Sequence, residues 1–489
     1  MDEMRIPSSF RDKVVNPNDI IQYIPKAGVV AFSGMAGTAL AKEVPSIISQ
    51  LDGSYNLTVL TGGTTTVQFE EELSVLQIDR RYPVISGGPL RNRTNSGLLH
   101  VFDYWLSEYS RLIRSGGIPQ AQHIDVAVIE SSGIVEDGII PSTSVDAMPA
   151  MVETAKKVIV EINLSKPVLY GLHDILPPRG NGLVLINDIL DRVGRPVVEC
   201  PPEKIAAIIV TDKPESGAGG YGGVSKSELA IAGQIDDLFS CKLGRKSLSQ
   251  KYAIQPGAGP LASALLDGLE VTGLRIWCEA ISVDWVRSIG DKVRAISSSC
   301  IYSLKGQEKI LREVYDEIDS FKEGLVLRPY EITNRAELIA CMNLISIQQA
   351  IEVDIYGNAN ITHIGGNLYN GVGGSGDFTR NAFLTILALP STTSDQKISR
   401  IVPVCSHVDV PEHDVDFLVT ENGWADLRGL SPRERAKIII EKCAADIFKN
   451  ALTTYFVKAC KNGGHEPISW KDALEFYQTM GLDGPSNSG

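Results

Sequence analysis

Short runs of β-branched and aliphatic residues alternate with helix-like segments along this chain, and this alternation restricts the folds that it can adopt. The runs that predict buried strands are 28–33, 57–61, 124–130 and 158–162. The first is followed by Gly34-Met35-Ala36-Gly37-Thr38 and a helical stretch near Ala41, and the second by Gly62-Gly63-Thr64. Strands that end in small residues before a helix place ligand loops at the carboxyl edge of a parallel sheet. The pattern therefore predicts an α/β fold.

A glycine-rich segment divides the chain into two halves. A chain of 489 residues is too long for one ordinary hydrophobic core, so we expect more than one domain. Residues 213–227 contain five glycines, one proline and three serines, and a helical pattern follows at 229–239. The alternation of strands and helices then starts again. We therefore predict an N-terminal domain over 1–222 and a C-terminal domain over 223–489, of similar α/β design, with a cleft between them.

Charge, hydropathy and cysteine usage argue against several classes of protein. The formal net charge of −13 disfavours a nucleic-acid backbone as partner. The sequence has no apolar run of the length that crosses a bilayer. Its first residues resemble neither a signal peptide nor a transit peptide, so we expect a cytoplasmic protein, or a mitochondrial one in a eukaryote. The eight cysteines occur singly, which favours reduced thiols over disulfides or a zinc site.

The segment most informative about function is Gly371-Val372-Gly373-Gly374-Ser375-Gly376-Asp377-Phe378. Backbone amides in such a turn can approach an anion or a developing oxyanion, because few side chains stand in the way. Gln255-Pro256-Gly257-Ala258-Gly259-Pro260 is a second glycine-rich turn. It opens a predicted helix over 261–269, whose first amides could meet a phosphate. A plain turn remains an open alternative for both segments.

Two further segments carry acidic side chains that chemistry could use. Residues 274–279 predict a strand that ends at Glu279, where a carboxylate facing a cleft can act as a nucleophile. The alternative is a solvated glutamate at a helix start, and the segment alone favours that interpretation. Residues 406–414 contain two histidines and three carboxylates. Their spacing does not match a helical HxxxH face, so a hydrogen-bonded corner is favoured over a metal site.

Ordered motifs extend from residue 42 to residue 428. They are 42–45, 136–138, 141–144, 257–259, 277–279, 328–334, 354–358, 370–381 and 407–428. Together they resemble the acetyl-CoA hydrolase/transferase family, the class I CoA-transferases of the succinyl-CoA:acetate type. So many matches in one order are hard to obtain by chance.

The resemblance implies two CoA-transferase domains of α/β type, an active site in the cleft between them, and a homodimer. By motif position, Glu279 matches the glutamate that becomes covalently linked to CoA. Asn334 and the backbone amide of Gly374 match the pair that stabilises the oxyanion, and Glu421 matches an active-site glutamate that positions substrate groups. The positions that match CoA contacts in relatives are Gly257, Ala258, Gly259, Pro260, Leu261, Asn370, Gly374 and Lys397.

The chemistry that the resemblance implies is exchange of CoA between small carboxylates, such as acetate with succinyl-CoA or another short acyl-CoA. Glu279 would attack the thioester, the released thiolate would attack the resulting anhydride, and a glutamyl-CoA thioester would remain. This route needs neither a metal nor a redox cofactor. An acetyl-CoA hydrolase would use the same glutamate, with water as acceptor. A non-catalytic CoA-binding subunit of a citrate-lyase-like complex is a hypothesis of another class.

The chain also departs from the family pattern. Relatives often have Tyr-Thr-Glu where this chain has Trp277-Cys278-Glu279. Many carry Asp-Arg-Asn where the nearest positions here are Glu215-Ser216-Gly217. If that arginine handles a second carboxylate or pairs with the position of Glu421, Ser216 cannot replace it. The sequence therefore leaves the acids undetermined and favours acetate over succinate.

Overall fold

The computed structural model describes residues 5–51, 55–64, 66–83, 88–176, 183–215, 217–218 and 223–481. By their internal contacts the residues form two compact units. Unit 1 comprises 1–222 and 275–342, and unit 2 comprises 223–274 and 343–489. One boundary between the units coincides with the predicted boundary at residue 222, and residues 275–342, with Glu279, group with unit 1. The division into domains 1–222 and 223–489 stays a prediction.

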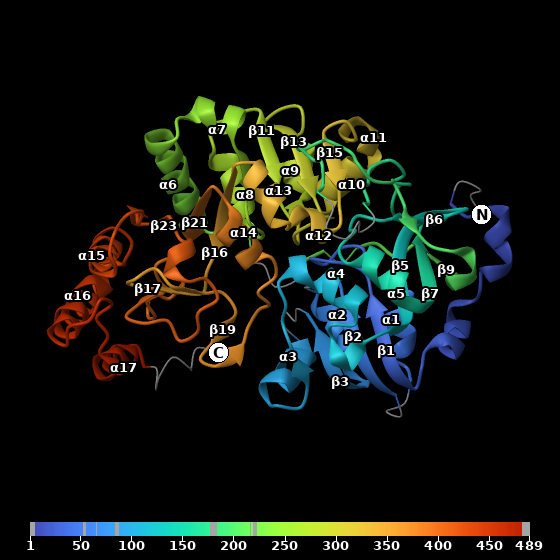
Figure 1. Cartoon of the computed structure of the whole chain (residues 1–489), viewed down its shortest axis with the longest axis horizontal. Coiled ribbons are helices and arrows are strands. Elements are labelled where there is room, and N and C mark those ends of the chain that lie inside the picture. Colours follow the sequence, from blue (N-terminus) through green and yellow to red (C-terminus); the bar gives the residue numbers. More distant parts are fainter. Residues whose placement is uncertain are drawn as a thin grey trace. The chain divides into compact units, whose positions relative to one another are not determined.

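Unit 1 is built on a parallel-rich sheet, in which the strand order is β4-β3-β2-β1-β5-β6-β8 and β7 pairs with both β5 and β9 (Figure 1). Its strands are β1 (Ala27–Phe32), β2 (Asn56–Thr61), β3 (Gln77–Tyr82), β4 (His100–Val101), β5 (Ile124–Val135), β6 (Gly138–Pro141), β7 (Ala155–Asn163), β8 (Val198–Glu199) and β9 (Ile205–Thr211). β1 runs parallel to β2 and β5, and β7 runs parallel to β5 and β9. The prediction of an α/β fold is confirmed.

Helices cover the sheet of unit 1. They are α1 (Glu43–Ile48), α2 (Val67–Ser74), α3 (Gly88–Asn95), α4 (Leu106–Ser115) and α5 (Met148–Thr154). Ile48 of α1 and Phe69 of α2 pack in one core with Phe32 and Val59 of the sheet, and all four side chains are buried. The rings of Phe32 and Phe69 meet edge to face, with their centroids 5.4 Å apart. This apolar burial positions the loops at the strand ends.

The later part of unit 1 carries Glu279. Its elements are β11 (Leu274–Trp277, beginning at the junction of the units), β12 (Ala280–Ser282), α9 (Val283–Arg287), β13 (Val293–Ser298), β14 (Cys300–Tyr302), α10 (Glu308–Asp316), α11 (Ile318–Phe321), β15 (Leu325–Leu327), α12 (Tyr330–Thr333) and α13 (Ala336–Cys341). β12 pairs with β14 and β13 with β15, both in parallel. The short strand β12 thus separates Glu279 from the next helix, α9, so Glu279 does not lie at a helix start.

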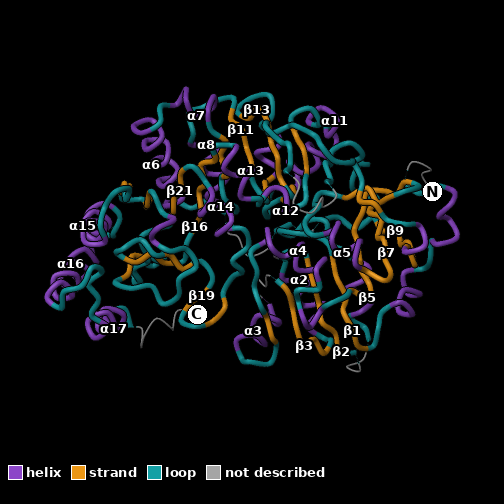
Figure 2. Tube along the Cα trace, in the orientation of Figure 1, coloured by secondary structure: helices purple, strands orange, loops and turns teal. Residues whose placement is uncertain are grey.

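Unit 2 contains a second sheet, in the order β10-β16-β21-β23-β24. Figure 2 distinguishes its strands from the surrounding helices. The elements of the unit are α6 (Lys226–Lys242), α7 (Arg245–Lys251), β10 (Ala253–Gln255), α8 (Pro260–Gly268), β16 (Leu344–Gln349), β17 (Glu352–Asp354), β18 (Ala359–Asn360), β19 (His363–Ile364), β20 (Asn367–Leu368), α14 (Ser375–Asn381), β21 (Leu384–Ala388), β22 (Ile401–Val402), β23 (Phe417–Thr420), β24 (Gly423–Asp426), α15 (Pro432–Lys442), α16 (Asp446–Lys461) and α17 (Trp470–Thr479). Leu418, Ile439, Leu452 and Phe476 share a core that joins β23 to α15, α16 and α17.

Local capping explains where α6 begins. The sequence predicted this helix over 229–239, whereas it begins at Lys226. The hydroxyl of Ser225 accepts from the backbone N–H of Glu228, and the Glu228 carboxylate accepts from the Ser225 N–H. This capping box satisfies amides at the helix start and so extends the helix.

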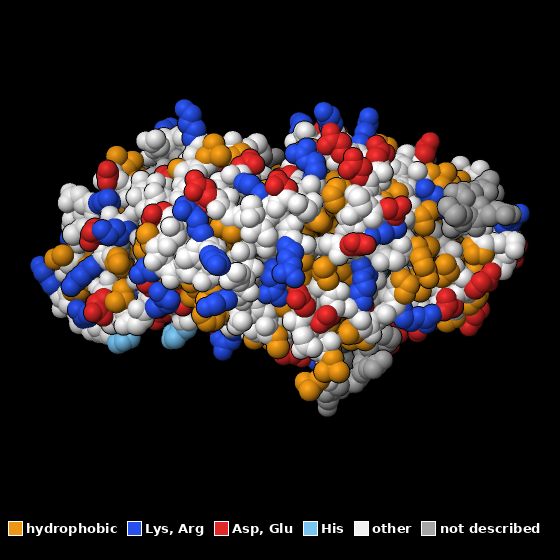
Figure 3. Space-filling view, turned by 90° about the horizontal axis from the view of Figure 1, so that it is seen from above, with side chains coloured by type: hydrophobic (Ala, Val, Ile, Leu, Met, Phe, Trp, Pro, Cys, Tyr) orange, Lys and Arg blue, Asp and Glu red, His pale blue; other side chains and the backbone are white. Residues whose placement is uncertain are grey.

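Surface properties agree with the composition. On the face shown in Figure 3, Lys and Arg side chains are interspersed with Asp and Glu side chains. Within the described part of the chain, the helices are too short or too polar to cross a membrane. The eight cysteines are free thiols in the structure, and five of them are buried.

Candidate active site

Glu279 and Asn334, which are 55 residues apart in the sequence, meet in unit 1. The side-chain N–H of Asn334 donates to Oε2 of Glu279 over 2.7 Å. Asn334 is buried, at 1% exposure, whereas Glu279 is only partly buried. A neutral amide that donates to a carboxylate stabilises its charged form without neutralising it. The pair therefore presents a partly exposed carboxylate with a fixed donor on one oxygen.

The main chain around Glu279 is held from both sides. Its carbonyl accepts from the N–H groups of Ser299 and Cys300, over 3.0 and 3.1 Å. The N–H of Cys278 donates to the carbonyl of Ser297 over 3.0 Å. Glu279 thus lies in a bend between β11 and β12, fastened to the segment that joins β13 to β14. Burial raises the pKa of the neighbouring Cys278 thiol to about 12, so this thiol is no competing nucleophile at neutral pH.

Asn334 follows directly after α12. Its backbone N–H donates to the carbonyl of Tyr330 over 2.8 Å, which fixes its main chain at the helix end. Its side-chain carbonyl accepts from the hydroxyl of Thr333 over 2.8 Å. The indole N–H of Trp277 donates to the carbonyl of Thr333 over 2.7 Å. The segments that carry Glu279 and Asn334 are therefore joined by direct hydrogen bonds.

The predicted CoA-contact turn at 257–261 lies in unit 2. Gly257 has φ +73° and Gly259 has φ +84°, a region that favours glycine. A Cβ on Gly257 would lie 2.8 Å from the carbonyl oxygen of Ile347, so the backbones approach closely there. The side-chain N–H of Gln349 donates to the carbonyl of Ala258 over 2.6 Å. Pro260 and Leu261 then open α8, at the position where proline starts a helix well.

The glycine-rich segment at 371–378 also lies in unit 2, and its second half is helical. Gly374 is the N-cap of α14, with φ −96° and ψ 8°. The residue with positive φ is its neighbour Gly373, at φ +55°. Upstream, the N–H of Asn370 donates to the carbonyl of Thr362 over 3.1 Å. The sequence did not predict α14, because glycine and serine are weak helix formers and the helix is short.

Glu421 accepts two hydrogen bonds from Ser391 within unit 2. Ser391 donates to its carboxylate from both the backbone N–H, over 2.8 Å, and the hydroxyl, over 2.5 Å. Asn422 donates to the same hydroxyl over 2.9 Å. Burial lowers the pKa of Arg400, and the charges of Tyr369 and Glu421 counteract that shift. Arg400 therefore supplies positive charge near Glu421, which the sequence interpretation did not foresee.

Lys397 is 79% exposed, and its ammonium lies 3.7 Å from a carboxylate oxygen of Asp395. Of the predicted site residues, the structure brings Glu279 and Asn334 together. The residues at 257–261, Asn370, Gly374, Lys397 and Glu421 all lie in unit 2, and their roles stay predictions. Ser216, the position for which the resemblance led us to expect an arginine, lies outside the described residues.

Comparison with known proteins identifies the family. Residues 1–209 match the model of the acetyl-CoA hydrolase/transferase N-terminal domain, and residues 311–456 match that of the C-terminal domain. The chain belongs to the acetyl-CoA hydrolase/transferase family. It is 37% identical to a succinyl-CoA:acetate CoA-transferase of Clostridium kluyveri, over 96% of this chain and 89% of the relative. It is 34% identical to an acetyl-CoA hydrolase of Neurospora crassa, over 97% of this chain and 95% of the relative.

Structural comparison agrees on the fold. The crystal structure of RipA from Yersinia pestis superposes with a TM-score of 0.70 and 21% sequence identity. The match covers 93% of this chain and 98% of RipA. As a member of the acetyl-CoA hydrolase/transferase family, the protein is an enzyme that acts on acyl-CoA.

The sequence did not predict a buried cluster of lysine and glutamate side chains that the structure contains. The ammonium of Lys166 lies 2.7 Å from Glu130 and also pairs with Glu215, and all three side chains are buried. Lys42 lies 2.5 Å from Glu130 and 3.3 Å from Glu215. Although burial alone would raise it, the two ammonium groups hold the pKa of Glu215 down at about 2. Glu215 is thus fixed directly before Ser216 in the sequence.

The histidine-containing segment at 406–414 forms the expected hydrogen-bonded corner. The carboxylate of Asp409 accepts from the N–H groups of Ile361 and Thr362, over 2.6 and 2.9 Å, and from the Thr362 hydroxyl over 2.9 Å. His407 contacts the same carboxylate over 3.1 Å. The Asp409 carboxylate therefore holds residues 361 and 362, upstream of Asn370, in place.

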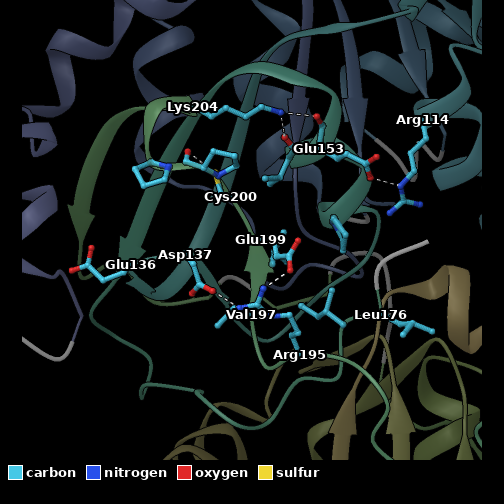
Figure 4. Close-up of a pocket in the computed structure, with 16 residues that line it drawn as sticks. Arg114, Glu136, Asp137, Glu153, Leu176, Arg195, Val197, Glu199, Cys200 and Lys204 are labelled. Atoms are coloured by element: carbon cyan, nitrogen blue, oxygen red, sulfur yellow. Dashed lines mark hydrogen bonds and ion pairs between the residues drawn. The ribbon is translucent and has the colours of Figure 1, made fainter. Parts of the chain in front are cut away.

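A cavity of about 760 Å³ lies in unit 1 (Figure 4). Its cations are paired within the protein. Arg114 pairs with Glu153, Arg195 pairs with Asp137 and Glu199, and Lys204 donates to the carbonyl of Glu153. The residues that line this cavity do not include Glu279 or Asn334, and nothing on its walls identifies a ligand.

Proposed function

We propose that the protein is a CoA-transferase that moves CoA between small carboxylates through a glutamyl-CoA thioester on Glu279. The observation that carries this proposal is the 2.7 Å hydrogen bond from Asn334 to Oε2 of Glu279. In this proposal, the other oxygen of the same carboxylate attacks the thioester. The family membership supports the substrate class, since similar relatives are named for CoA transfer and acetyl-CoA hydrolysis.

In the first step of the proposed reaction, the second carboxylate oxygen of Glu279 attacks the thioester carbon of the donor acyl-CoA. The C–S bond breaks, CoA leaves as the thiolate, and an acyl-glutamyl anhydride remains. The attacking oxygen becomes the bridging oxygen of the anhydride. Oε2 becomes its carbonyl oxygen, and the Asn334 donor stays on it.

In the second step, the CoA thiolate attacks the glutamyl carbon. Negative charge then develops on Oε2, the atom to which Asn334 already donates. A donor placed in advance at such an oxyanion contributes about 10²–10³ to the rate. The bond from the glutamyl carbon to the bridging oxygen breaks, the first acid leaves, and Glu279 carries CoA as a thioester. An acceptor carboxylate reverses both steps. The resemblance assigns the amide of Gly374 as a second donor, and we include this assignment in the proposal.

Acetyl-CoA hydrolysis is the second candidate, because several relatives are named acetyl-CoA hydrolase. In that case water takes the place of the acceptor acid at the glutamyl-CoA thioester. The test compares CoA release from acetyl-CoA alone with acyl-CoA formation when propionate, succinate or butyrate is added. We expect transfer to exceed hydrolysis by at least about tenfold, a difference of about 1.4 kcal/mol in barrier. Hydrolysis faster than transfer with every acid would contradict transferase function.

A non-catalytic CoA-binding subunit is the hypothesis of another class. Activity of the purified chain on its own excludes it, and activity only after addition of other subunits supports it. We also propose a homodimer in the cytoplasm. Light scattering during gel filtration tests the dimer, and cell fractionation tests the compartment.

A further inference from the structure

We propose that Thr333 is a positioning residue for this reaction, which holds the Asn334 amide with its N–H toward Glu279. The inference rests on the proposed function, in which Asn334 stabilises the negative charge that develops on Oε2 of Glu279. Thr333 is fully buried, and its hydroxyl donates to Oδ1 of Asn334 over 2.8 Å. Nδ2 of the same amide donates to Glu279 over 2.7 Å.

The orientation of the amide decides whether Asn334 helps or opposes the charge on Glu279. An asparagine amide has a donor end and an acceptor end of nearly the same size, so rotation by half a turn exchanges them. In the exchanged orientation, an amide oxygen would face a carboxylate oxygen, and two acceptors repel. The Thr333 hydroxyl is a donor to the acceptor end in the observed orientation. It therefore stabilises the orientation that presents the donor to Glu279.

Thr333 is held in place by Trp277, a residue of the segment that carries Glu279. Trp277, two residues before Glu279, donates from its indole N–H to the carbonyl of Thr333 over 2.7 Å. The guanidinium of Arg328 lies over the Trp277 ring, 5.4 Å from its centroid. Arg328 is held in turn by Asp174, over 3.1 Å, and by the hydroxyl of Ser297, over 2.6 Å.

Apart from Glu279, the residues of this network are at most 2% exposed. A buried network with each member hydrogen-bonded has one favoured geometry, and removal of one donor leaves its acceptor unsatisfied. The carbonyl and the hydroxyl of Thr333 thus have different partners. The carbonyl sets the distance between the two segments, and the hydroxyl sets the rotation of the amide.

The direct test replaces the hydroxyl and keeps the shape, with Thr333→Val. We expect kcat to fall about 10- to 100-fold, somewhat less than for loss of an oxyanion donor itself. The KM for acyl-CoA should stay within about threefold, because Thr333 acts on charge development rather than on ground-state binding. Thr333→Ser, which restores the hydroxyl, should recover kcat to within about threefold of the parent. Thr333→Ala serves as a second variant without the hydroxyl should the valine variant fold poorly.

A double-mutant cycle with Asn334→Ala tests whether Thr333 acts through Asn334. If Thr333 acts through Asn334, Thr333→Val should lower kcat by less than about twofold once Asn334 is alanine. An equal loss in both backgrounds would overturn the inference, as would Thr333→Val and Thr333→Ala variants that turn over like the parent. A lowered melting temperature that Thr333→Ser does not restore would assign Thr333 to stability alone.

The proposed function is checked separately on the parent enzyme, by the mass gain that accompanies a CoA adduct. Failure to form this adduct would contradict the proposed function. Adduct formation by the parent, with normal turnover by the hydroxyl-free variants, would overturn only the role of Thr333.

Discussion

The Glu279 region of unit 1 and the glycine-rich turns of unit 2 present polar groups in opposite ways. Around Glu279, buried side chains fix one another: Thr333 orients Asn334, and Asn334 donates to the carboxylate. In the turns, the backbone itself provides the amides, and positive φ angles at Gly257 and Gly373 shape it. Side-chain networks are sensitive to the loss of single atoms, whereas backbone turns are sensitive to the addition of a Cβ. Around Glu279, the most damaging substitutions should therefore be those that remove a hydrogen-bonding atom. In the turns, they should be those that add a side chain.

The largest effect is expected for Glu279→Ala. The turnover should fall by at least about 10³-fold, because covalent catalysis depends on this carboxylate. Since Glu279 is only partly buried, the melting temperature should change by no more than about 3 °C. Steady-state kinetics and thermal melting on one preparation check both. Turnover within tenfold of the parent would exclude Glu279 as the nucleophile.

The next largest effect is expected for Asn334→Ala. The kcat should fall about 10²–10³-fold, since a donor to the developing oxyanion is lost. Asn334→Asp serves as the sharper comparison, because it keeps the size and replaces the donor with a second negative charge beside Glu279. We expect the aspartate variant to be slower than the alanine variant at neutral pH. The opposite order would show that the donor has no electrostatic role.

A smaller effect is expected for Gly374→Val in the glycine-rich segment. Its φ of −96° is accessible to any residue, so backbone strain does not accompany the substitution. If this amide serves CoA or an oxyanion, turnover should fall at least about tenfold, while the melting temperature falls only slightly.

Gly373→Ala is the matched control for this variant. At φ +55° the alanine should cost about 1–2 kcal/mol of the free energy of unfolding, with less effect on turnover per folded molecule. Denaturant unfolding and kinetics on both variants separate the two outcomes. Normal turnover with a low melting temperature for Gly374→Val would make the segment a plain turn.

The smallest effect is expected for Lys397→Ala. An exposed lysine that contacts a CoA phosphate contributes about 0.2–1 kcal/mol, which corresponds to a rise in KM of up to about fivefold. The rise should diminish as the salt concentration increases. Lys309→Ala, with a side chain that is 90% exposed in unit 1, removes the same charge and should leave KM unchanged. Equal KM changes in both variants would exclude a specific contact at Lys397.

Local sequence patterns predicted much of the sheet in unit 1 because buried parallel strands are apolar over their length. The run at 28–33 corresponds to β1, and the run at 57–61 corresponds to β2. The run at 124–130 is the first part of β5, which continues to Val135. The part beyond the predicted run begins with Ser131 and Ser132, polar side chains that the fold buries and that a hydropathy pattern cannot assign to a strand.

The residues of the candidate site could be predicted where they belong to sequence motifs. Contacts between residues that are far apart in the sequence could not be predicted. The resemblance identified Glu279 and Asn334, and the structure adds their contact. The cluster of Lys42, Lys166 and Glu130 gives no local signal, since its members pair across 36 and 88 positions of the sequence. Trp277 likewise indicates only a buried strand until its indole N–H is seen to bind Thr333.

The central claim is that Glu279 carries CoA. The enzyme is incubated with acetyl-CoA in the absence of an acceptor acid, and the intact protein and its proteolytic peptides are weighed. We predict a mass gain of one CoA less one water, located on the peptide that contains Glu279 and absent from Glu279→Ala. An adduct on another residue, or rapid transfer by an enzyme that never gains this mass, would contradict the account.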